Sequence, residues 1–392
     1  MEIKTDVVIV GTGAAGLFTA LSLPEDMEIL MITKSDLESS DSYLAQGGIC
    51  VLKDESDYDD YYEDTMRAGH YENREESVEI LLHKSWEVIQ DLVKYGVEFE
   101  TENGEFIYTR EGAHSRPRIL YHEDITGKEI TSKLLSQAKQ RKNITMMEYT
   151  TMTDLIEENG TCIGIIVEKE IEKFPIYAEY TILASGGIGG TYKNSTNYPH
   201  LTGDAIAIGQ KHGVKMEHLD YVQIHPTTLY SKTPGRRFLI SESVRGEGAV
   251  LLDKNMKRFT DELQPRDVVS QAIFQQMEKD GTDHVWLSME PIPEEMILNH
   301  FPNIYKKCLE EGYDVLKECI PVVPAQHYFM GGIWVDSDSK TSMPKLYAVG
   351  ETSCTGVHGK NRLASNSLLE CIVFGKQAAK HIINERNCGM NA

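Results

Sequence analysis

The first sixteen residues, MEIKTDVVIVGTGAAG, constrain this chain more than any other stretch. The apolar, β-branched run Val7–Val10 has the length and composition of a buried strand. Gly11, Gly13 and Gly16 follow at GxGxxG spacing, and small residues continue into a predicted helix. In a strand–turn–helix unit, such glycines permit a tight turn, the approach of a pyrophosphate, and close packing of the helix on the strand. This order predicts an α/β domain that binds a dinucleotide.

The end of the second predicted strand distinguishes between dinucleotides. NAD sites place an Asp or Glu there, about 20 residues after the glycines, to bind the ribose 2′-OH. Here the strand expected at Glu28–Thr33 is followed by Lys34, and no acid stands at its end. The pattern counts against NAD and leaves FAD open. The alternative interpretation is a glycine-rich turn without a ligand.

Further patterns predict the elements around this unit. Ser77–Tyr95 has helical periodicity, with Trp86 and Val93 expected on its buried face. The acidic segment Asp54–Asp64 is expected to be a solvated face or a helix start. Other expected elements are a hairpin over Ile144–Glu168, a strand over Tyr180–Ala184 leading into a glycine loop beside the ligand, a helix over Asp204–His212, a strand over Lys345–Glu351, and a helix starting near Ser367.

The length of the chain predicts more than one domain. Its 392 residues exceed what a single compact core holds. Prolines, aromatic residues and separate His and Arg residues become frequent between Leu219 and His327, and nucleotide-binding patterns return at Lys345. We therefore expect residues 1–218 and 329–392 to form a Rossmann-like FAD-binding domain. Residues 219–328 are expected to form an inserted α+β capping domain that contributes to a substrate site.

Composition argues against several classes of protein. The net charge of −22 disfavours nucleic-acid and anionic-membrane partners. No apolar run reaches the ~20 residues that span a bilayer, and no signal-peptide pattern stands at the N-terminus. The seven cysteines are scattered, without CxxC spacing. These features predict a cytoplasmic protein with no metal site and no disulfide framework.

Blocks along essentially the whole chain resemble one flavoprotein superfamily, which contains succinate dehydrogenase, fumarate reductase and L-aspartate oxidase. These blocks are GTGAAG at Gly11, YLAQGGI at Tyr43, TREGAHS at Thr109, LASGGIGGTY at Leu183, QIHPTTL at Gln223, ESVRGEGA at Glu242, PRDVVSQAI at Pro265, HYFMGGI at His327, YAVGE at Tyr347 and NRLASNSLLE at Asn361. The resemblance implies FAD as the cofactor.

Two positions resemble the L-aspartate oxidase branch. Where covalent members carry a flavin-linking histidine before AQGG, this chain has Asp41, which implies non-covalent FAD. Glu111 stands where that branch is thought to meet the substrate ammonium, and a buried cation needs a paired anion. Two alternatives stay open. One is a soluble fumarate reductase that oxidises succinate, and the other is a flavin-binding subunit that assembles with electron-transfer partners.

The resemblance implies roles residue by residue. FAD would contact Gly11, Thr12, Gly13, Ala14, Ala15, Gly16, Lys34, Ser42, Tyr43, Leu44, Ala45, Gln46, Gly47, Gly48, Asp204, Glu351, Ser367 and Leu368. The substrate carboxylates would contact His225, Ser241, His327, Arg362 and Ser365. The catalytic set would be Arg266 as proton carrier, Glu111 at the ammonium, and Glu242 and Arg245 beside Arg266.

The activity implied by the resemblance is oxidation of L-aspartate to iminoaspartate by hydride transfer to flavin N5, with O₂ or fumarate as electron acceptor. This is the first step of quinolinate and NAD biosynthesis, so a quinolinate synthase is the expected functional partner. Relatives usually continue into a C-terminal helical domain. This sequence ends at Ala392, so that domain is expected to be absent.

Overall fold

A seven-stranded sheet forms the centre of the nucleotide-binding part in this computed structural model, which describes residues 2–233 and 235–390. The strand order is β7-β2-β1-β10-β9-β8, and β17 pairs with β10. Strands β7, β2, β1, β10 and β17 run parallel, whereas β8, β9 and β10 form an antiparallel meander. The bounds are β1 Ile3–Val10, β2 Ile29–Ile32, β7 Ile144–Met147, β8 Thr150–Glu158, β9 Thr161–Lys169, β10 Glu172–Leu183 and β17 Leu346–Ala348.

Both faces of this sheet are buried, which explains the continuous apolar run in β1. Val7 and Ile9 pack into one core cluster, whereas Val8 and Val10 pack into a second one, as the period of two in a strand requires. The first cluster is covered by helices α1 (Ala14–Ser22), α4 (Glu75–Lys94), α5 (Thr126–Gln140) and α11 (Asn366–Met390). Helix α6 (Asp204–Lys211) contributes to the second cluster.

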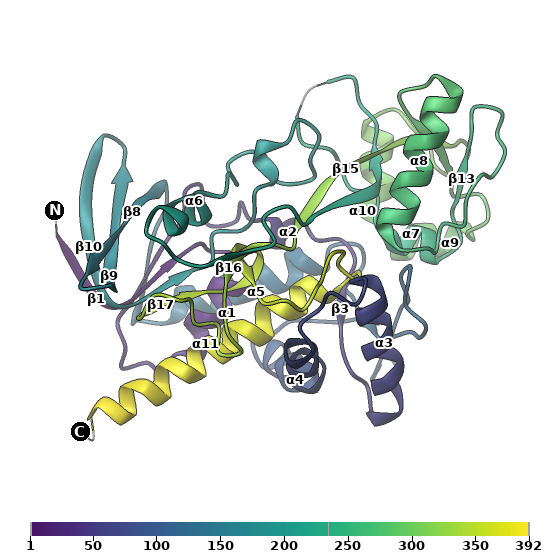
Figure 1. Ribbon diagram of the computed structural model, residues 1–392. Helices are drawn as coiled ribbons and strands as arrows, with labels where there is room; N and C mark the ends of the chain where they lie inside the picture. The colour runs from purple at the N-terminus through teal and green to yellow at the C-terminus, as the bar shows by residue number, and fades with distance from the viewer. Residues whose placement is uncertain (1, 234, 391–392) are drawn as a thin grey trace.

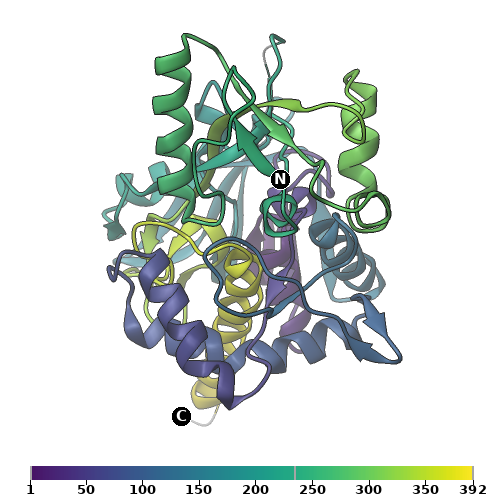
Figure 2. The ribbon, with the colours of Figure 1, turned by 90° about the vertical axis from the view of Figure 1, so that its right-hand side faces the viewer.

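A third core cluster lies between Leu229 and Val322. It belongs to a four-stranded sheet of order β12-β15-β14-β13, flanked by helices. Its elements are β12 Val222–Leu229, β13 Val250–Leu252, β14 Val285–Ser288, β15 Ile320–Phe329, α7 Glu242–Gly246, α8 Arg266–Asp280, α9 Glu294–His300 and α10 Pro302–Glu310. Figure 1 shows most of these elements at one end of the molecule, and Figure 2 shows them above α3, α4 and α11. The chain boundaries at 218/219 and 328/329 stay a prediction.

The remaining helices and strands complete the fold. Their bounds are α2 Asp41–Leu44, β3 Ile49–Cys50, α3 Tyr58–Ala68, β4 Thr101–Glu102, β5 Glu105–Phe106, β6 Ile119–Leu120, β11 Met216–Glu217, β16 Gly332–Trp334, β18 Ser353–Cys354, and the 3₁₀ turns Glu55–Asp57, Gly189–Thr191 and Gly350–Thr352.

The α/β class predicted from the sequence is confirmed, and three local expectations need correction. Ile144–Glu168 is not a single hairpin, because Ile144–Met147 leaves it to pair with β2 in parallel. In α4, Trp86 and Val93 lie at the border of the buried stripe and are 39% and 43% exposed. The segment Asp54–Asp64 does start a helix, but two of its carboxylates are buried.

Those two carboxylates are buried because Arg118 binds them. Asp57 Oδ2 accepts a hydrogen bond from Arg118 Nε at 2.9 Å, and Asp64 Oδ2 accepts one from Nη1 at 2.7 Å. The guanidinium is itself fully buried, so all three charges are compensated within one cluster. Nη1 also lies 3.0 Å from His114 Nδ1, while His114 Nε2 lies 3.0 Å from the carbonyl oxygen of Ala364. The cluster therefore ties the loop of Glu111 to the loop before α11.

Candidate active site

A deep pocket opens at the carboxyl ends of the parallel strands. Its walls include Val10–Gly13 after β1, Thr33 and Lys34 after β2, Ala184–Gly186 after β10, and Val349–Glu351 after β17. Open α/β sheets bind their ligands at this edge. The glycine loop that follows β10, expected from the sequence to lie beside the ligand, contributes Ser185 and Gly186 to the wall.

The first turn of this wall requires glycine. Gly11 has φ +120°, and a Cβ there would collide with the carbonyl group of Ala184, the residue just after the neighbouring strand β10. A Cβ on Gly16 would collide with the carbonyl oxygen of Gly11, so the third glycine lets helix α1 pack against the turn. Gly13 differs, because its Cβ would meet nothing closer than the Ser42 hydroxyl at 3.3 Å. A Cβ on Gly13 would therefore need only a small shift of that hydroxyl, so the fold itself does not require glycine at this position of the pocket wall.

We expect Gly11→Ala to lower the stability of the flavin-free protein by about 1–3 kcal/mol, the usual cost of an unfavourable backbone conformation. Gly13→Ala is the matched control, because an added methyl group fits the fold but occupies the pocket. Thermal unfolding of flavin-free protein and flavin content after purification measure the two effects. Equal destabilisation by both substitutions would contradict the different roles of the two glycines.

Most residues expected to contact FAD line the pocket, and three do not. Ala14, Gly16 and Tyr43 are absent from its wall. The Ala14 N–H donates to Ser42 Oγ at 3.2 Å, Gly16 faces Gly11, and the Tyr43 ring lies 5.9 Å from the ammonium of Lys128. The expected contacts that do line it are Gly11, Thr12, Gly13, Ala15, Lys34, Ser42, Leu44, Ala45, Gln46, Gly47, Gly48, Asp204, Glu351, Ser367 and Leu368.

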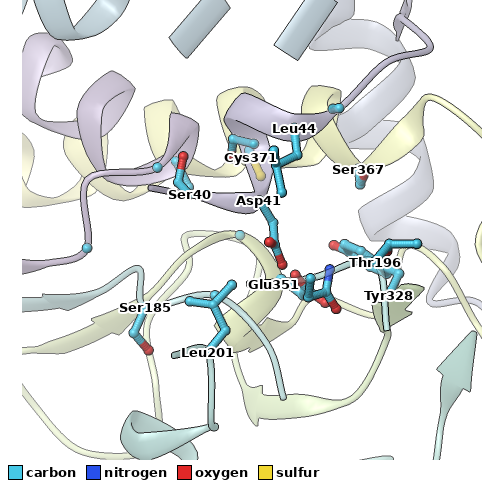
Figure 3. A pocket seen from close by; sticks show the side chains of 18 of the residues that line it. Ser40, Asp41, Leu44, Ser185, Thr196, Leu201, Tyr328, Glu351, Ser367 and Cys371 are labelled. Atoms are coloured by element: carbon cyan, nitrogen blue, oxygen red, sulfur yellow. The ribbon is translucent and has the colours of Figure 1, made fainter. Parts of the chain in front are cut away.

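The polar groups of this wall fit a dinucleotide. Lys34 Nζ lies 2.6 Å from Asp204 Oδ2, so a cation and an acceptor stand together at the end of β2. The buried atoms Asp41 Oδ2 and Gln46 Oε1 have no hydrogen-bond partner among the described residues. Because buried polar atoms are nearly always satisfied, these atoms point to a polar ligand in the pocket. Figure 3 shows Asp41 and Glu351 extending into this space, with Ser367 near one side.

Glu111 is a buried residue that also lines this pocket. Its Oε1 accepts a hydrogen bond from Ser243 Oγ at 2.8 Å, and its Oε2 accepts one from Ser365 Oγ at 2.5 Å. Burial and the charge of Glu242 raise the pKa of the Glu111 carboxyl above its ordinary value, although both hydroxyls favour the ionised form. A cationic ligand group would bind to such a carboxylate and complete its ionisation.

Two guanidinium groups stand beside Glu111 and share one acceptor. Arg266 Nη1 donates to Gln223 Oε1 at 2.9 Å, and Arg362 Nε donates to the same oxygen at 3.3 Å. The Arg362 guanidinium lies over the Tyr328 ring at 4.4 Å and also binds the Ser367 hydroxyl. Burial and the charge of Arg266 lower the pKa of Arg362 to about 10, so it remains a cation at neutral pH. The pair is suited to binding carboxylates.

Glu242 compensates the charge of Arg266. Its Oε2 accepts a hydrogen bond from Arg266 Nε at 2.5 Å, and Arg245 Nη2 lies 3.6 Å from the same oxygen. Burial opposes ionisation of Glu242, but the charges of Arg266 and Arg245 outweigh it and hold the carboxyl pKa below its ordinary value. Arg245 does not line the pocket. It is fully buried behind Glu242 and donates to the carbonyl oxygen of Glu262 at 2.5 Å.

Two neutral histidines complete the wall. The rings of His225 and His327 lie 5.1 Å apart, and His327 Nδ1 is 2.7 Å from the Thr196 hydroxyl. Burial and the nearby charge of Arg266 hold the pKa of both imidazoles below the ordinary value. His225 Nε2 is buried and has no partner among the described residues, as expected for a group that meets a ligand. Ser241 also lines the pocket, but its hydroxyl already caps helix α7.

No role was predicted from the sequence for Gln223 or Ser243, although they lie inside the motifs QIHPTTL and ESVRGEGA. Gln223 stands two residues before His225 on strand β12, so period-two alternation places both on one face. Ser243 is the residue after Glu242, and Ser241 Oγ donates to it at 3.2 Å while Ser243 donates onward to Glu111. Local spacing could have suggested Gln223. The link from Ser243 to Glu111 joins segments that lie far apart in the sequence.

The described residues lack membrane-spanning helices and metal-binding clusters. Within 2–233 and 235–390, no helix is both long and apolar enough to cross a membrane. The same residues contain no cluster of His, Cys, Asp and Glu side chains arranged to hold a metal ion.

The chain is similar to known flavoproteins in both sequence and structure. Residues 6–368 match the FAD binding domain family. The chain is 49% identical to an L-aspartate oxidase of Clostridium perfringens, covering 99% of this chain and 91% of that protein. It is 50% identical to the L-aspartate oxidase of Clostridium acetobutylicum, covering 97% and 88%. A mutant of E. coli quinol fumarate reductase FrdA superposes with a TM-score of 0.91 at 29% identity, covering 98% of this chain and 70% of that one.

The family match, the sequence relatives and the structural match all indicate an FAD-binding flavoprotein. The family match covers nearly the whole two-part fold, including the glycine turn and the loop of Arg362. The two clostridial proteins share about half of their residues with this chain along almost its full length. This chain therefore belongs to the L-aspartate oxidase family of FAD-binding flavoproteins.

Proposed function

We propose that this protein is an FAD-dependent oxidoreductase that oxidises L-aspartate to iminoaspartate, with O₂ or fumarate as the electron acceptor. The observation that carries the proposal is the buried carboxylate of Glu111, which two hydroxyls hold beside two guanidinium groups. A substrate with one ammonium and two carboxylates matches this arrangement of charges. A dicarboxylate without an amine would leave Glu111 without a cationic partner.

The side chains around Glu111 would bind the two carboxylates of the substrate. Arg362 supplies a fixed cation, and His225 and His327 supply neutral ring nitrogens that orient without adding charge. Ser241 and Ser365 line the same pocket. The Ser365 hydroxyl already donates to Glu111, so it acts mainly by holding that carboxylate in place.

The pocket residues near the glycine turn, Glu351 and the start of α11 would hold FAD without a covalent bond. The glycine turn after β1 would admit the pyrophosphate, Glu351 would meet a ribose or ribityl hydroxyl, and the start of α11 at Ser367 and Leu368 would face the electron-rich edge of the ring. When bound, the flavin supplies hydride acceptance at N5. The protein would bind and orient the substrate and exclude water around it.

Arg266 would move the proton that leaves the substrate. Nη2 of Arg266 has no hydrogen bond within the described residues, whereas Nε and Nη1 are engaged by Glu242 and Gln223. The guanidinium can first pass its Nε proton along the short contact to Glu242 Oε2, and the neutral guanidine that results can then accept the substrate proton at Nη2. Arg245 would balance that charge from behind, without contact with substrate. Arginine is otherwise a weak base at neutral pH, so this anchored, water-poor position is required.

Anaerobic addition of L-aspartate should bleach the oxidised-flavin absorbance of the purified protein, and fumarate or air should restore it. Succinate is the matched ligand, because it lacks only the amine. Bleaching by succinate and not by aspartate would replace the proposal with a succinate-oxidising fumarate reductase, the alternative favoured by the likeness to E. coli FrdA. If neither ligand bleaches the flavin of a flavin-loaded protein, both activities are refuted.

The chemistry of the proposed product indicates which kind of enzyme would act next. Iminoaspartate is unstable in water, so an enzyme that consumes it must act soon after it is formed. We assign that role to a quinolinate synthase, in the pathway toward NAD, in the cytoplasm. Residues 219–328 would act as the capping domain, because Arg266 and His225 reach the pocket from that part while Glu111 and Arg362 reach it from the other.

A further inference from the structure

Two carboxyl groups of the flavin pocket, those of Asp41 and Glu351, face each other. Asp41 begins helix α2, and Glu351 lies in the 3₁₀ turn after β17, so the two come from opposite walls. Figure 3 shows their side chains extending toward one another across the pocket. Asp41 Oδ1 accepts the Tyr198 N–H at 3.0 Å, and Glu351 Oε1 accepts the Phe329 N–H at 2.9 Å. Each carboxyl is thus held in place by one backbone donor.

Neither carboxyl has a cation in direct contact. Among the described residues, no Lys, Arg or His side chain lies within ion-pair distance of Asp41 or Glu351. Asp204 and Glu242, which line the same pocket, both have such partners in Lys34 and Arg266. Asp41 Oδ2 is buried without any hydrogen-bond partner among the described residues. Two unpaired carboxylates that face each other in a buried site cannot both stay ionised at low cost, so the favoured state of the pair holds one proton.

We propose that Asp41 and Glu351 act as one carboxyl pair that keeps a shared proton in the pocket, and that FAD binding depends on this proton. The inference rests on FAD occupying the pocket. With one proton the pair offers FAD an O–H donor and a single negative charge. Without the proton it offers no donor, and two negative charges stand in the pocket that must accept the anionic diphosphate of FAD.

The surrounding charges support this assignment. Burial raises the pKa of Asp41 to about 7, although Arg236 acts in the opposite direction. Burial and the charge of Asp41 raise the pKa of Glu351 to about 8; Arg362 lowers it and Glu370 raises it. The other titratable neighbours are Tyr198, Tyr328 and Cys371. Since the two carboxyls interact, they titrate as a pair, and the transition falls within the range in which enzymes are assayed.

The test is the release of FAD from diluted holoenzyme, followed by free-flavin fluorescence between pH 6 and pH 9. The wild-type dissociation constant should rise about tenfold across this range, because loss of one proton above the upper pKa weakens binding. Asp41→Asn keeps the volume and the acceptor for Tyr198 N–H but removes the pair. Its dissociation constant should rise by a clearly smaller factor over the same range, because Glu351 keeps the burial that raises its pKa but loses the charge of Asp41.

Asp204→Asn is the matched control, because it removes a carboxylate of the same pocket that is already paired with Lys34. The ratio of its FAD dissociation constants at pH 9 and pH 6 should equal that of the wild type, whatever its absolute affinity for FAD. A wild-type ratio in Asp41→Asn, or loss of the ratio in Asp204→Asn, would overturn the proposal. Absence of FAD binding at pH 6 in the wild type would instead refute the flavin site itself.

Thermal unfolding of the flavin-free protein gives a second measurement. Carboxyls whose pKa is raised in the folded state stabilise it fully below the unfolded pKa, and that contribution is lost as pH rises through the folded pKa. Asp41→Asn should therefore gain unfolding temperature relative to the wild type as pH increases from 6 to 9. A constant difference over this range would contradict the shared proton, even if the variant binds FAD poorly.

Discussion

Arg266→Gln should lower kcat for L-aspartate by about a thousandfold, within the range that a positioned acid–base group supplies. Arg266 is the cation that contacts Glu242 Oε2 at 2.5 Å and Gln223 Oε1 at 2.9 Å within the pocket. A glutamine amide can still form hydrogen bonds there, but it carries no charge and takes up no proton. Single-turnover bleaching of the flavin measures the chemical step, and the flavin content of the purified variant shows whether the cofactor site is intact.

Arg362→Gln is the matched control for Arg266→Gln. Both arginines line the same pocket and donate to Gln223 Oε1, but Arg362 lies over the Tyr328 ring and has no contact with Glu242. Its loss should raise KM more than it lowers kcat, as expected for a group that binds a carboxylate throughout the reaction. If kcat in Arg266→Gln falls only by the factor by which affinity falls, Arg266 is an electrostatic clamp and the proton moves elsewhere.

The nucleotide-binding unit was predictable because its determinants are local. Gly11 and Gly16 are required by contacts within one strand–turn–helix unit and its neighbouring strand, and their spacing is visible in the sequence. The error in α4 has an equally simple cause. Periodicity shows which side chains share a stripe, but not how wide the buried stripe is. Trp86 and Val93, seven residues apart, both fall at its border.

The site was predictable as a set of motifs, but not as a set of contacts. Its motifs do converge on one pocket, although Arg245, Ala14, Gly16 and Tyr43 stay outside it. The acidic segment Asp54–Asp64 was expected to be a solvated face or a helix start, and its composition could not show that two of its carboxylates are buried, because their partner Arg118 lies more than fifty residues later in the chain. The position of Asp41 opposite Glu351 is likewise set by the approach of two distant segments. Such pairings depend on the assembled sheet, and no local pattern encodes them.

Glu111→Gln should lower kcat/KM for L-aspartate by about a hundredfold, since leaving a buried charge without its partner costs about 3 kcal/mol. The substrate ammonium would then face a neutral amide in a pocket that also holds Arg266 and Arg362. Succinate, tested as a competitive ligand, has no ammonium and should bind the variant about as well as the wild type. Steady-state kinetics with aspartate, and inhibition constants for succinate, measure the discrimination. An equal loss with both ligands would show that Glu111 shapes the pocket instead of recognising the amine.

The pH dependence of kcat/KM for L-aspartate tests whether Glu111 acts through its charge or through its shape. Glu111 must be ionised to pair with an ammonium, and its pKa is raised, so kcat/KM for aspartate should fall as pH decreases toward that pKa. Ser243→Ala removes a hydroxyl that donates to Oε1 at 2.8 Å and so favours the ionised form. The acid limb should therefore move to higher pH in Ser243→Ala and vanish in Glu111→Gln. A limb that stays in place in Ser243→Ala but vanishes in Glu111→Gln would mean that Ser365 alone sets the ionisation of Glu111. A limb that survives in Glu111→Gln belongs to another group, and recognition of the amine by Glu111 would then have to be abandoned.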